Sequence, residues 1–299
     1  KYFVKDSKPA FLICEDSEIK NLKPICDEVG CKILSMSANG EGEITDGLKN
    51  FDNYFKPAFR KDEDLAALLY TSGTTGKPKG AMLTQQNLVS NAIQLVNLWN
   101  INRDDTLIHS LPIYHTHGLF VAMNTTMMAG ATVRFLKNFN LDYVFEAFNK
   151  STLMMGVPTF YTRLLKDNRL NEKHTKNMRL FISGSAPLLK ETHKNFYDIT
   201  GHHILERYGM TETNMNSSNP LDGVRKAGSV GKPIKDINIR IKAIEGSEVF
   251  NKNQIGMIEI KGPNVFKGYL NKLDQTKEAF TKDGYFITGD IGYFDDDGY

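Results

Sequence analysis

One segment of the sequence has the residue types and spacing to bind a polyphosphate. Its residues are, in order, Thr71, Ser72, Gly73, Thr74, Thr75, Gly76, Lys77, Pro78 and Lys79. Small residues let the backbone approach phosphate oxygens, hydroxyl and N–H groups donate to those oxygens, and lysines neutralise their charge. The segment is not a Walker A loop, because Pro78 follows Lys77 and no glycine stands five places before Gly76. We expect a phosphate-binding loop rather than a flexible linker, since a rigid proline lies inside it.

The elements beside this loop predict how it is held. Residues 65–70 are almost continuously apolar, which indicates a buried strand before the loop. A helix that Thr84 can cap follows the loop. The single tryptophan, Trp99, falls on the apolar face of this helix with Leu95, so it is expected in the core rather than at a ligand.

The rest of the chain predicts an α/β protein with two parts. Further strands are expected at 106–111, 132–136, 153–157, 179–183 and 203–208, and helices at 141–148 and from Pro158. After about Lys226 the pattern changes, because Ile237, Ile239 and Ile241 alternate with polar residues as in half-exposed antiparallel strands. We therefore expect α/β subdomains over 1–225 and a smaller β-rich, barrel-like subdomain over 226–299.

Charge and composition narrow the class of protein. The chain of 299 residues has 37 Lys plus Arg and 35 Asp plus Glu, a formal net charge of +2. This near-neutral balance argues against a nucleic-acid partner, and no apolar stretch approaches the ~20 residues of a membrane span. The three cysteines form no CxxC pair and leave one over, which favours reduced thiols in a cytoplasmic location.

Five ordered segments together resemble the adenylate-forming superfamily of acyl-CoA synthetases, nonribosomal adenylation domains and luciferases. They are the loop at 71–79, an aromatic-His segment at 111–118, a turn at 183–188, a Tyr-Gly-x-Thr-Glu motif at 208–212 and the segment 284–290. Within the superfamily, the amino-acid sequence of residues 156–165 and 206–216 is most similar to that of malonyl-CoA synthetases. The resemblance implies the large N-terminal domain of that fold, with mixed βα layers, and implies that the family's C-terminal domain is absent from these residues.

The same resemblance implies an acid–thiol ligase that uses ATP, Mg²⁺ and coenzyme A to activate a small carboxylic acid. The substrate carboxylate is itself the nucleophile, so the enzyme needs positioning and charge stabilisation rather than a Ser or Cys nucleophile. The chain has no GxSxG, HExxH or GxGxxG motif, which agrees with this chemistry. The fragment alone is expected to make little acyl-CoA, because the family's catalytic lysine lies in the domain that is absent.

Residue roles follow from the resemblance, position by position. The loop residues Thr71 to Gly76 and Lys79 are expected to hold the β- and γ-phosphates. Thr211 is expected to bond the α-phosphate, Glu212 to hold Mg²⁺ and Asp290 to accept from the ribose. The expected adenine neighbours are Gly184, Ser185, Ala186, Glu206, Arg207 and Tyr208, and Gly209 is expected to belong to the same nucleotide site. Without the motif, Glu212 would be a solvated surface carboxylate and Asp290 an ordinary turn residue.

The substrate side depends on two arginines and two histidines. The resemblance makes His115 a wall between acyl group and phosphates, and His117, with Ser183, a contact to the substrate. Arg163 and Arg207 lie in pocket motifs, and a cation there suits a short dicarboxylate such as malonate or methylmalonate. The alternatives are that Arg163 is a surface helix residue and Arg207 the ion-pair partner of a neighbouring Glu.

Some readings stay open at the level of sequence. His115 and His117 would share one face of a strand, so a metal site is conceivable, although no further ligand stands at suitable spacing. The acidic run at 295–297 lacks EF-hand spacing and indicates a solvated turn rather than a calcium loop. The parent protein could instead be a ligase for another short-chain, fatty or aromatic acid, or a non-catalytic nucleotide-binding module.

Overall fold

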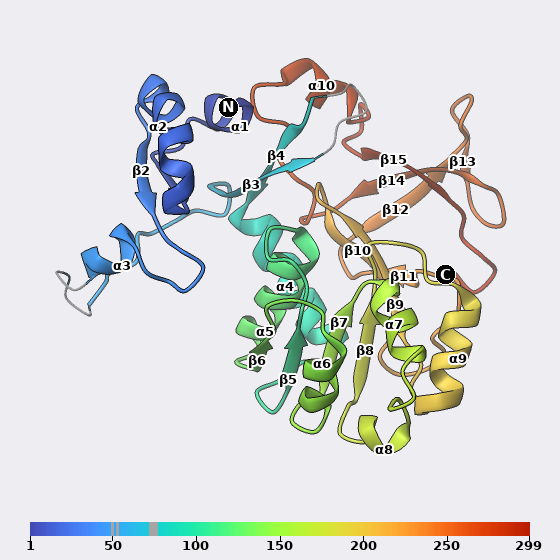
Figure 1. Ribbon diagram of the computed structural model, residues 1–299. Coiled ribbons are helices and arrows are strands. Elements are labelled where there is room, and N and C mark those ends of the chain that lie inside the picture. Colours follow the sequence, from blue (N-terminus) through green and yellow to red (C-terminus); the bar gives the residue numbers. More distant parts are fainter. Residues whose placement is uncertain (49–50, 52–53, 72–76) are drawn as a thin grey trace.

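A seven-stranded sheet organises most of the chain (Figure 1). The computed structural model describes residues 1–48, 51, 54–71 and 77–299. The strand order is β11-β10-β9-β8-β7-β5-β6. The strands are β5 (Thr106–His109), β6 (Thr132–Phe135), β7 (Leu153–Gly156), β8 (Leu180–Ser183), β9 (Leu205–Met210), β10 (Asn214–Ser218) and β11 (Lys232–Pro233). Strands β5 to β9 pair in parallel, and β10 and β11 are added antiparallel at one edge.

Helices cover both faces of this sheet because its parallel strands are apolar on both sides. They are α4 (Gln85–Leu98), η1 (a π-helix, His117–Met123), α5 (Asn124–Met128), α6 (Leu141–Phe148), α7 (Pro158–Leu165), α8 (Glu172–Thr175) and α9 (Lys190–Thr200). Leu153 and Met155 of β7 pack with Trp99 at the end of α4, whereas Met154 between them packs with Phe196 of α9. The expected strands and helices of this part are confirmed, as is the burial of Trp99.

The hairpin that flanks residues 72–76 differs from its prediction. Among the described residues, strand β3 (Leu65–Thr71) pairs with β4 (Lys79–Thr84) and with no other strand, and Leu65 is half exposed. The expectation of a buried strand is wrong because a two-stranded sheet leaves part of its surface open. Strand β4 itself was not predicted. The predicted cap is confirmed, since the Thr84 hydroxyl accepts from the Asn87 N–H and the Asn87 side chain accepts from the Thr84 N–H.

A second sheet of four strands lies beside the first, in the order β13-β12-β14-β15 (Figure 1). Its elements are β12 (Asn238–Lys242), β13 (Val249–Phe250), β14 (Gly256–Lys261) and β15 (Phe286–Gly292), with α10 (Leu273–Glu278) before β15. The alternating pattern predicted this antiparallel sheet. Pro233 pairs with Ser217 of the large sheet, and β12 is the first strand of the small sheet along the chain. The division into two parts at Lys226 stays a prediction.

The N-terminal part forms a small parallel pair of strands with its own helices. Its elements are α1 (Tyr2–Ser7), β1 (Phe11–Cys14), α2 (Asp16–Val29), β2 (Lys32–Ser35) and α3 (Glu43–Leu48). Two hydrogen bonds attach it to the hairpin of β3 and β4, from Tyr2 Oη to the Pro78 carbonyl (2.9 Å) and from Tyr70 Oη to Asp6 Oδ2 (2.8 Å). Within the described ranges, no helix is long and apolar enough to cross a bilayer.

Candidate active site

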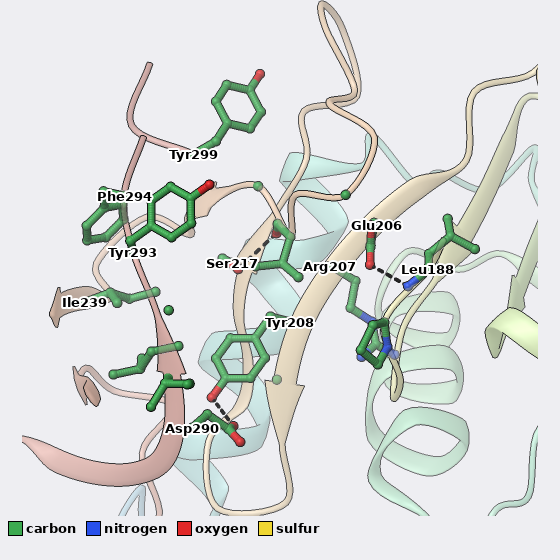
Figure 2. A pocket seen from close by; sticks show the side chains of 18 of the residues that line it. Leu188, Glu206, Arg207, Tyr208, Ser217, Ile239, Asp290, Tyr293, Phe294 and Tyr299 are labelled. Carbon is green, nitrogen blue, oxygen red and sulfur yellow. Dashed lines mark hydrogen bonds between the residues drawn. The ribbon is translucent and has the colours of Figure 1, made fainter. Parts of the chain in front are cut away.

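Two cavities of similar size meet at the carboxyl ends of β8 and β9. Ligand sites in parallel sheets commonly occupy this position. Cavity A, about 620 Å³, lies between the turn after β8, strand β9 and strands of the small sheet (Figure 2). Cavity B, about 640 Å³, lies between β9, the ends of β3 and β4, and the segment 269–289. Ser185 and Gly209 line both cavities, so the two are neighbouring parts of one site.

A buried arginine lies beside the shared wall. Arg207 of β9 is 2% exposed, and its Nε and Nη2 atoms find no hydrogen-bond partner among the described residues. Its guanidinium packs on Gly184, where an added Cβ would lie 2.4 Å from Arg207 Cζ. Burial lowers the pKa of Arg207 to about 9. The arrangement therefore presents a desolvated cation with no anionic partner among the residues that the structure describes.

The neighbouring carboxylate does not pair with this cation. Glu206 Oε1 accepts from the Leu188 N–H at 2.9 Å, and Oε2 has no partner in the described part of the chain (Figure 2). Burial raises the pKa of Glu206 to about 7. The alternative that Arg207 serves as ion-pair partner of an adjacent Glu is therefore not what the structure shows.

Two histidines approach the arginine from the start of η1. His117 Nδ1 lies 3.2 Å from Ser185 Oγ, and the His117 N–H donates to His115 Nδ1 at 3.2 Å. Burial lowers the pKa of both rings, and the charge of Arg207 lowers it further. Both are therefore neutral at pH 7. The histidines do not lie on a strand, because His117 begins a π-helix, a form often found at functional sites.

The carboxylate of Glu212 faces cavity B. It is 6% exposed, and its Oε1 accepts from Tyr269 Oη at 2.9 Å, with Thr71 Oγ1 at 3.5 Å. Lys79 Nζ lies 4.4 Å from the centre of the Tyr269 ring. Carboxylate oxygens suit Mg²⁺, which usually binds through one or two carboxylates together with ligand phosphates. No three His, Cys, Asp or Glu side chains cluster as a metal site in the described residues, so a cation at Glu212 would share phosphate ligands.

A hydrogen bond joins two residues that line cavity A. Tyr208 Oη of β9 donates to Asp290 Oδ2 of β15 at 2.6 Å (Figure 2). The bond joins the large sheet to the small one. The exposed Asp290 keeps its other carboxylate oxygen available to accept from a hydroxyl.

The structure brings most of the predicted residues together. Cavity A takes Ser185, Ala186, Glu206, Arg207, Tyr208, Gly209 and Asp290, and cavity B takes Thr71, Lys79, His115, Ser185, Gly209, Thr211 and Glu212. Gly184 and His117 do not line a cavity themselves but contact residues that do, Gly184 through Arg207 and His117 through Ser185. Ser183 is fully buried at the end of β8. Residues Ser72, Gly73, Thr74, Thr75 and Gly76 lie outside the described residues.

Arg163 does not line either cavity. It is exposed on α7, with Cζ 4.7 Å from the centre of the Phe139 ring. The structure therefore separates the two arginines that the sequence placed in one pocket.

Sequence reasoning missed several lining residues. The small sheet contributes Ile239, Ile241 and Ile258 to cavity A, and the chain after β15 contributes Tyr293, Phe294 and Tyr299. Alternation identified the inward face of β12 but not what that face covers. Tyr269, which holds Glu212, stands 57 positions away in sequence and gives no local signal.

Comparison with known proteins now places the chain in a family. The family model described as AMP-binding enzyme matches residues 1–270. The chain belongs to the AMP-binding enzyme family. The expected adenylate-forming fold is thereby confirmed.

Relatives within the AMP-binding family differ in the acid that they are named for. Malonate–CoA ligase of Arabidopsis thaliana is 35% identical over 100% of this chain and 52% of the relative. The mitochondrial malonate–CoA ligase ACSF3 of Mus musculus is 34% identical over 100% of this chain and 57% of the relative. Long-chain-fatty-acid–CoA ligase of Bacillus subtilis is 34% identical over 81% of this chain and 44% of the relative. The chain spans about half the length of these curated relatives.

Solved structures of related enzymes match the fold of this chain over nearly its whole length. This chain resembles apo MatB from Rhodopseudomonas palustris with a TM-score of 0.97 at 49% identity, and the match covers 100% of this chain and 59% of the MatB chain. A malonyl-CoA ligase complex with methylmalonyl-CoA and AMP bound gives 0.84 at 33% identity, over 100% and 62%. o-Succinylbenzoate CoA synthetase from Bacillus subtilis, in complex with ATP and magnesium ion, gives 0.83 at 28% identity, over 99% and 59%.

Proposed function

We propose that the protein is an ATP-dependent acid–thiol ligase that converts malonate or methylmalonate to its CoA thioester. The observation that carries the choice of acid is the buried Arg207, which has no anionic partner in the described part of the chain. Relatives named malonate–CoA ligases, and a neighbour with methylmalonyl-CoA and AMP bound, support the same choice.

The proposed reaction has two steps. A carboxylate oxygen of the acid attacks the α-phosphorus of ATP, and the bond from that phosphorus to the bridging oxygen breaks as pyrophosphate leaves. The sulfur of CoA, which gives up its proton, then attacks the carbonyl carbon and releases AMP. Neither step needs a protein nucleophile, so the protein acts by orienting groups and by stabilising charge.

Cavity B suits the phosphates in this proposal. Lys79, with Thr71 and the loop residues between them, would hold the β- and γ-phosphates, and Thr211 would bond the α-phosphate. Glu212, oriented by Tyr269, would hold Mg²⁺, which supplies positive charge to the triphosphate when bound. The position of His115 in the lining of cavity B supports a role between the acyl group and the phosphates.

Cavity A suits the nucleoside. Its apolar isoleucines and aromatic residues offer surfaces for a base, and Ser185, Ala186, Glu206, Tyr208 and Gly209 border the same space. Gly184 contributes by leaving room for the Arg207 guanidinium. Asp290 would accept from the ribose hydroxyls.

Arg207 supports a dicarboxylate because an unpaired buried charge is costly and a carboxylate can pair with it bidentately. His117 and the buried Ser183 hydroxyl would complete the contact to the substrate tail. Arg163 is a second candidate for binding the same carboxylate. Because it lies outside both cavities, its exposed side chain would have to move to reach the acid. A monocarboxylate would leave the guanidinium unpaired, so it should be a poor substrate.

The experiment is pyrophosphate release with malonate, methylmalonate, propionate and a medium-chain fatty acid, followed by detection of the CoA thioester. The longest natural protein that contains this chain is the appropriate sample. Preference for malonate or methylmalonate supports the proposal. Preference for propionate or the fatty acid identifies a ligase for another acid, and tight ATP binding without any release identifies a non-catalytic nucleotide-binding module.

We also propose a cytoplasmic location, supported by three free cysteines. A localisation experiment tests this proposal. A mitochondrial location, as in the names of several relatives, would contradict it. The proposed partners are the acid, ATP and CoA, with no nucleic acid.

A further inference from the structure

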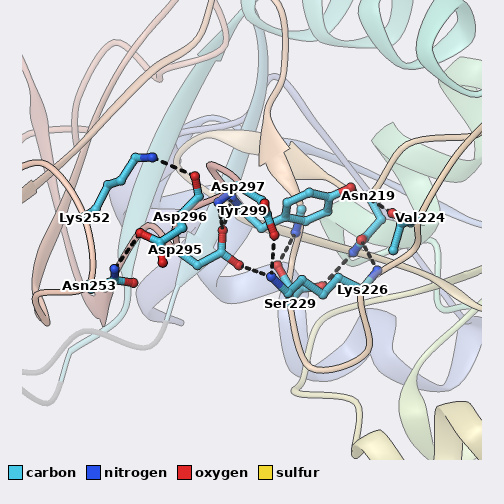
Figure 3. Close-up of polar contacts among 11 residues, drawn as sticks. Asn219, Val224, Lys226, Ser229, Lys252, Asn253, Asp295, Asp296, Asp297 and Tyr299 are labelled. Carbon is cyan, nitrogen blue, oxygen red and sulfur yellow. Dashed lines mark hydrogen bonds and ion pairs between the residues drawn. The ribbon is translucent and has the colours of Figure 1, made fainter.

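Polar contacts join the chain after β15 to a loop of the large sheet (Figure 3). Both segments contribute residues to the lining of cavity A. Lys226, in the loop 219–231 between β10 and β11, places Nζ 2.5 Å from Asp295 Oδ2 and 3.1 Å from Asp297 Oδ2. Tyr299 Oη donates to the Val224 carbonyl at 2.8 Å. These contacts join the acidic turn at 295–297, which the proposed function does not use, to the opposite wall of the cavity.

The loop side of this connection is anchored to β9. Asn219 is 1% exposed, and its Nδ2 donates to the carbonyls of Glu206 (2.9 Å) and Ser229 (2.6 Å). Its Oδ1 accepts from the Lys226 N–H at 2.9 Å. The backbone of Lys226 is thus held by a residue that is bound to the strand carrying Glu206 and Tyr208.

The turn side is organised by one carboxylate. Asp295 Oδ1 accepts from the N–H groups of Asp297 (3.0 Å) and Tyr299 (2.8 Å), which leaves Oδ2 for Lys226. The Tyr299 ring lies near two ammonium groups, with its centre 5.5 Å from Lys226 Nζ and 4.7 Å from Lys232 Nζ. Tyr293, Phe294 and Tyr299 of this segment line cavity A, whereas Lys226 itself does not.

We propose that Lys226 is a positioning residue for the nucleoside site, and that its ion pairs with Asp295 and Asp297 set the width of cavity A. The hydrogen bond between Tyr208 and Asp290 joins the walls at one end of the cavity, and Lys226 joins them at the other. The proposal rests on the proposed function of cavity A as the nucleoside site. Because Lys226 is 41% exposed, its ion pairs are of moderate strength.

The test compares the affinities for AMP and for pyrophosphate in wild type, Lys226→Met, Lys226→Arg and Lys252→Met. In the proposed site AMP would place its adenine and ribose in cavity A and its phosphate beside Thr211 in cavity B, whereas pyrophosphate would need only cavity B. Lys252 is a matched control because its Nζ donates to the Asp296 carbonyl of the same turn at 2.6 Å but does not reach the loop 219–231 (Figure 3). Lys226→Met should weaken AMP binding about two- to fivefold, within the range for loss of a partly exposed ion pair. Pyrophosphate binding should stay unchanged, Lys226→Arg should restore AMP affinity, and Lys252→Met should bind AMP as wild type does.

Three results would overturn the proposal: unchanged AMP affinity in Lys226→Met, equal weakening of AMP and pyrophosphate, or equal weakening in Lys252→Met. If Lys226→Met does not fold, Asp297→Asn removes the outer partner, which is 71% exposed, and should weaken AMP binding about twofold. Unchanged AMP affinity in that folded variant would contradict the proposal. A wild-type protein that binds no AMP would instead contradict the proposed function, so the two failures are distinguishable.

Discussion

Replacing Arg207 with methionine should stabilise the protein while removing its preference for a dicarboxylate. The side chain is 2% exposed, and burial lowers its pKa far below the ordinary guanidinium value, to about 9. At ~1.4 kcal/mol for each pKa unit, this burial costs several kcal/mol. The folded pKa lies below the unfolded one, so the cost is fully present at pH 7 and decreases only as the pH rises above about 9.

Methionine has similar length and no charge, so the unfolding free energy of Arg207→Met should rise by ~1–3 kcal/mol. The assay is urea unfolding at pH 7 without ligands. Arg169→Met is the matched control, because Arg169 pairs on the surface with Asp142 and Asp167. Its replacement should leave stability unchanged or lower it by less than ~1 kcal/mol.

The same variant should lose selectivity in kcat/KM between malonate and propionate. A charge-assisted pair contributes ~1.5–3 kcal/mol for each hydrogen bond, so the ratio should fall by at least about tenfold. Arg163→Met, measured in parallel, ranks the two arginines. If Arg207→Met is clearly less stable than wild type, or keeps its malonate selectivity, then Arg207 is not a buried unpaired cation that binds the substrate carboxylate.

Three other substitutions test the remaining features of the site. Burial raises the pKa of Glu206 to about 7, so its stabilising protonation is complete below about pH 4.5 and is lost as the pH rises through 7. Glu206→Gln should therefore become more stable than wild type by on the order of 2 kcal/mol between pH 4.5 and 7.5, and parallel urea-unfolding profiles would contradict this. Tyr269→Phe should weaken ATP binding about two- to tenfold when Mg²⁺ is present and leave it unchanged without Mg²⁺, as measured by calorimetric titration; equal loss in both conditions would argue against a metal at Glu212. Lys79→Ala should weaken pyrophosphate binding by ~1–3 kcal/mol, and undiminished affinity in the same titration would remove it from the phosphate site.

The sequence predicted those elements whose signal is local. β7 and β8 are short apolar runs and are fully buried, as expected for central parallel strands. Pro158 begins α7 because its missing N–H costs nothing at the first helical position. β3 was wrongly expected to be buried, because apolar residues alone do not reveal that a strand has only one partner.

The site could be predicted as a set of segments but not as a geometry. Motifs placed Arg207 and Glu212 near a nucleotide, whereas the close packing of Arg207 on Gly184 and the bond from Tyr269 to Glu212 depend on contacts between distant segments. The position of His117 in a π-helix was also unpredictable, since its hydrogen-bonding pattern depends on packing beside β5 and β10. Lys226 gave no signal because its partners stand about 70 residues later in an acidic turn that indicated solvent exposure.

The most direct test of the central claim is an experimental structure of the longest natural form of the protein with malonate and a non-hydrolysable ATP analogue. We predict that one malonate carboxylate lies ~2.7–2.9 Å from the Arg207 guanidinium nitrogens, and that the other points to the α-phosphate. Malonate bound elsewhere, with Arg207 still unpaired in its pocket against Gly184, would contradict it.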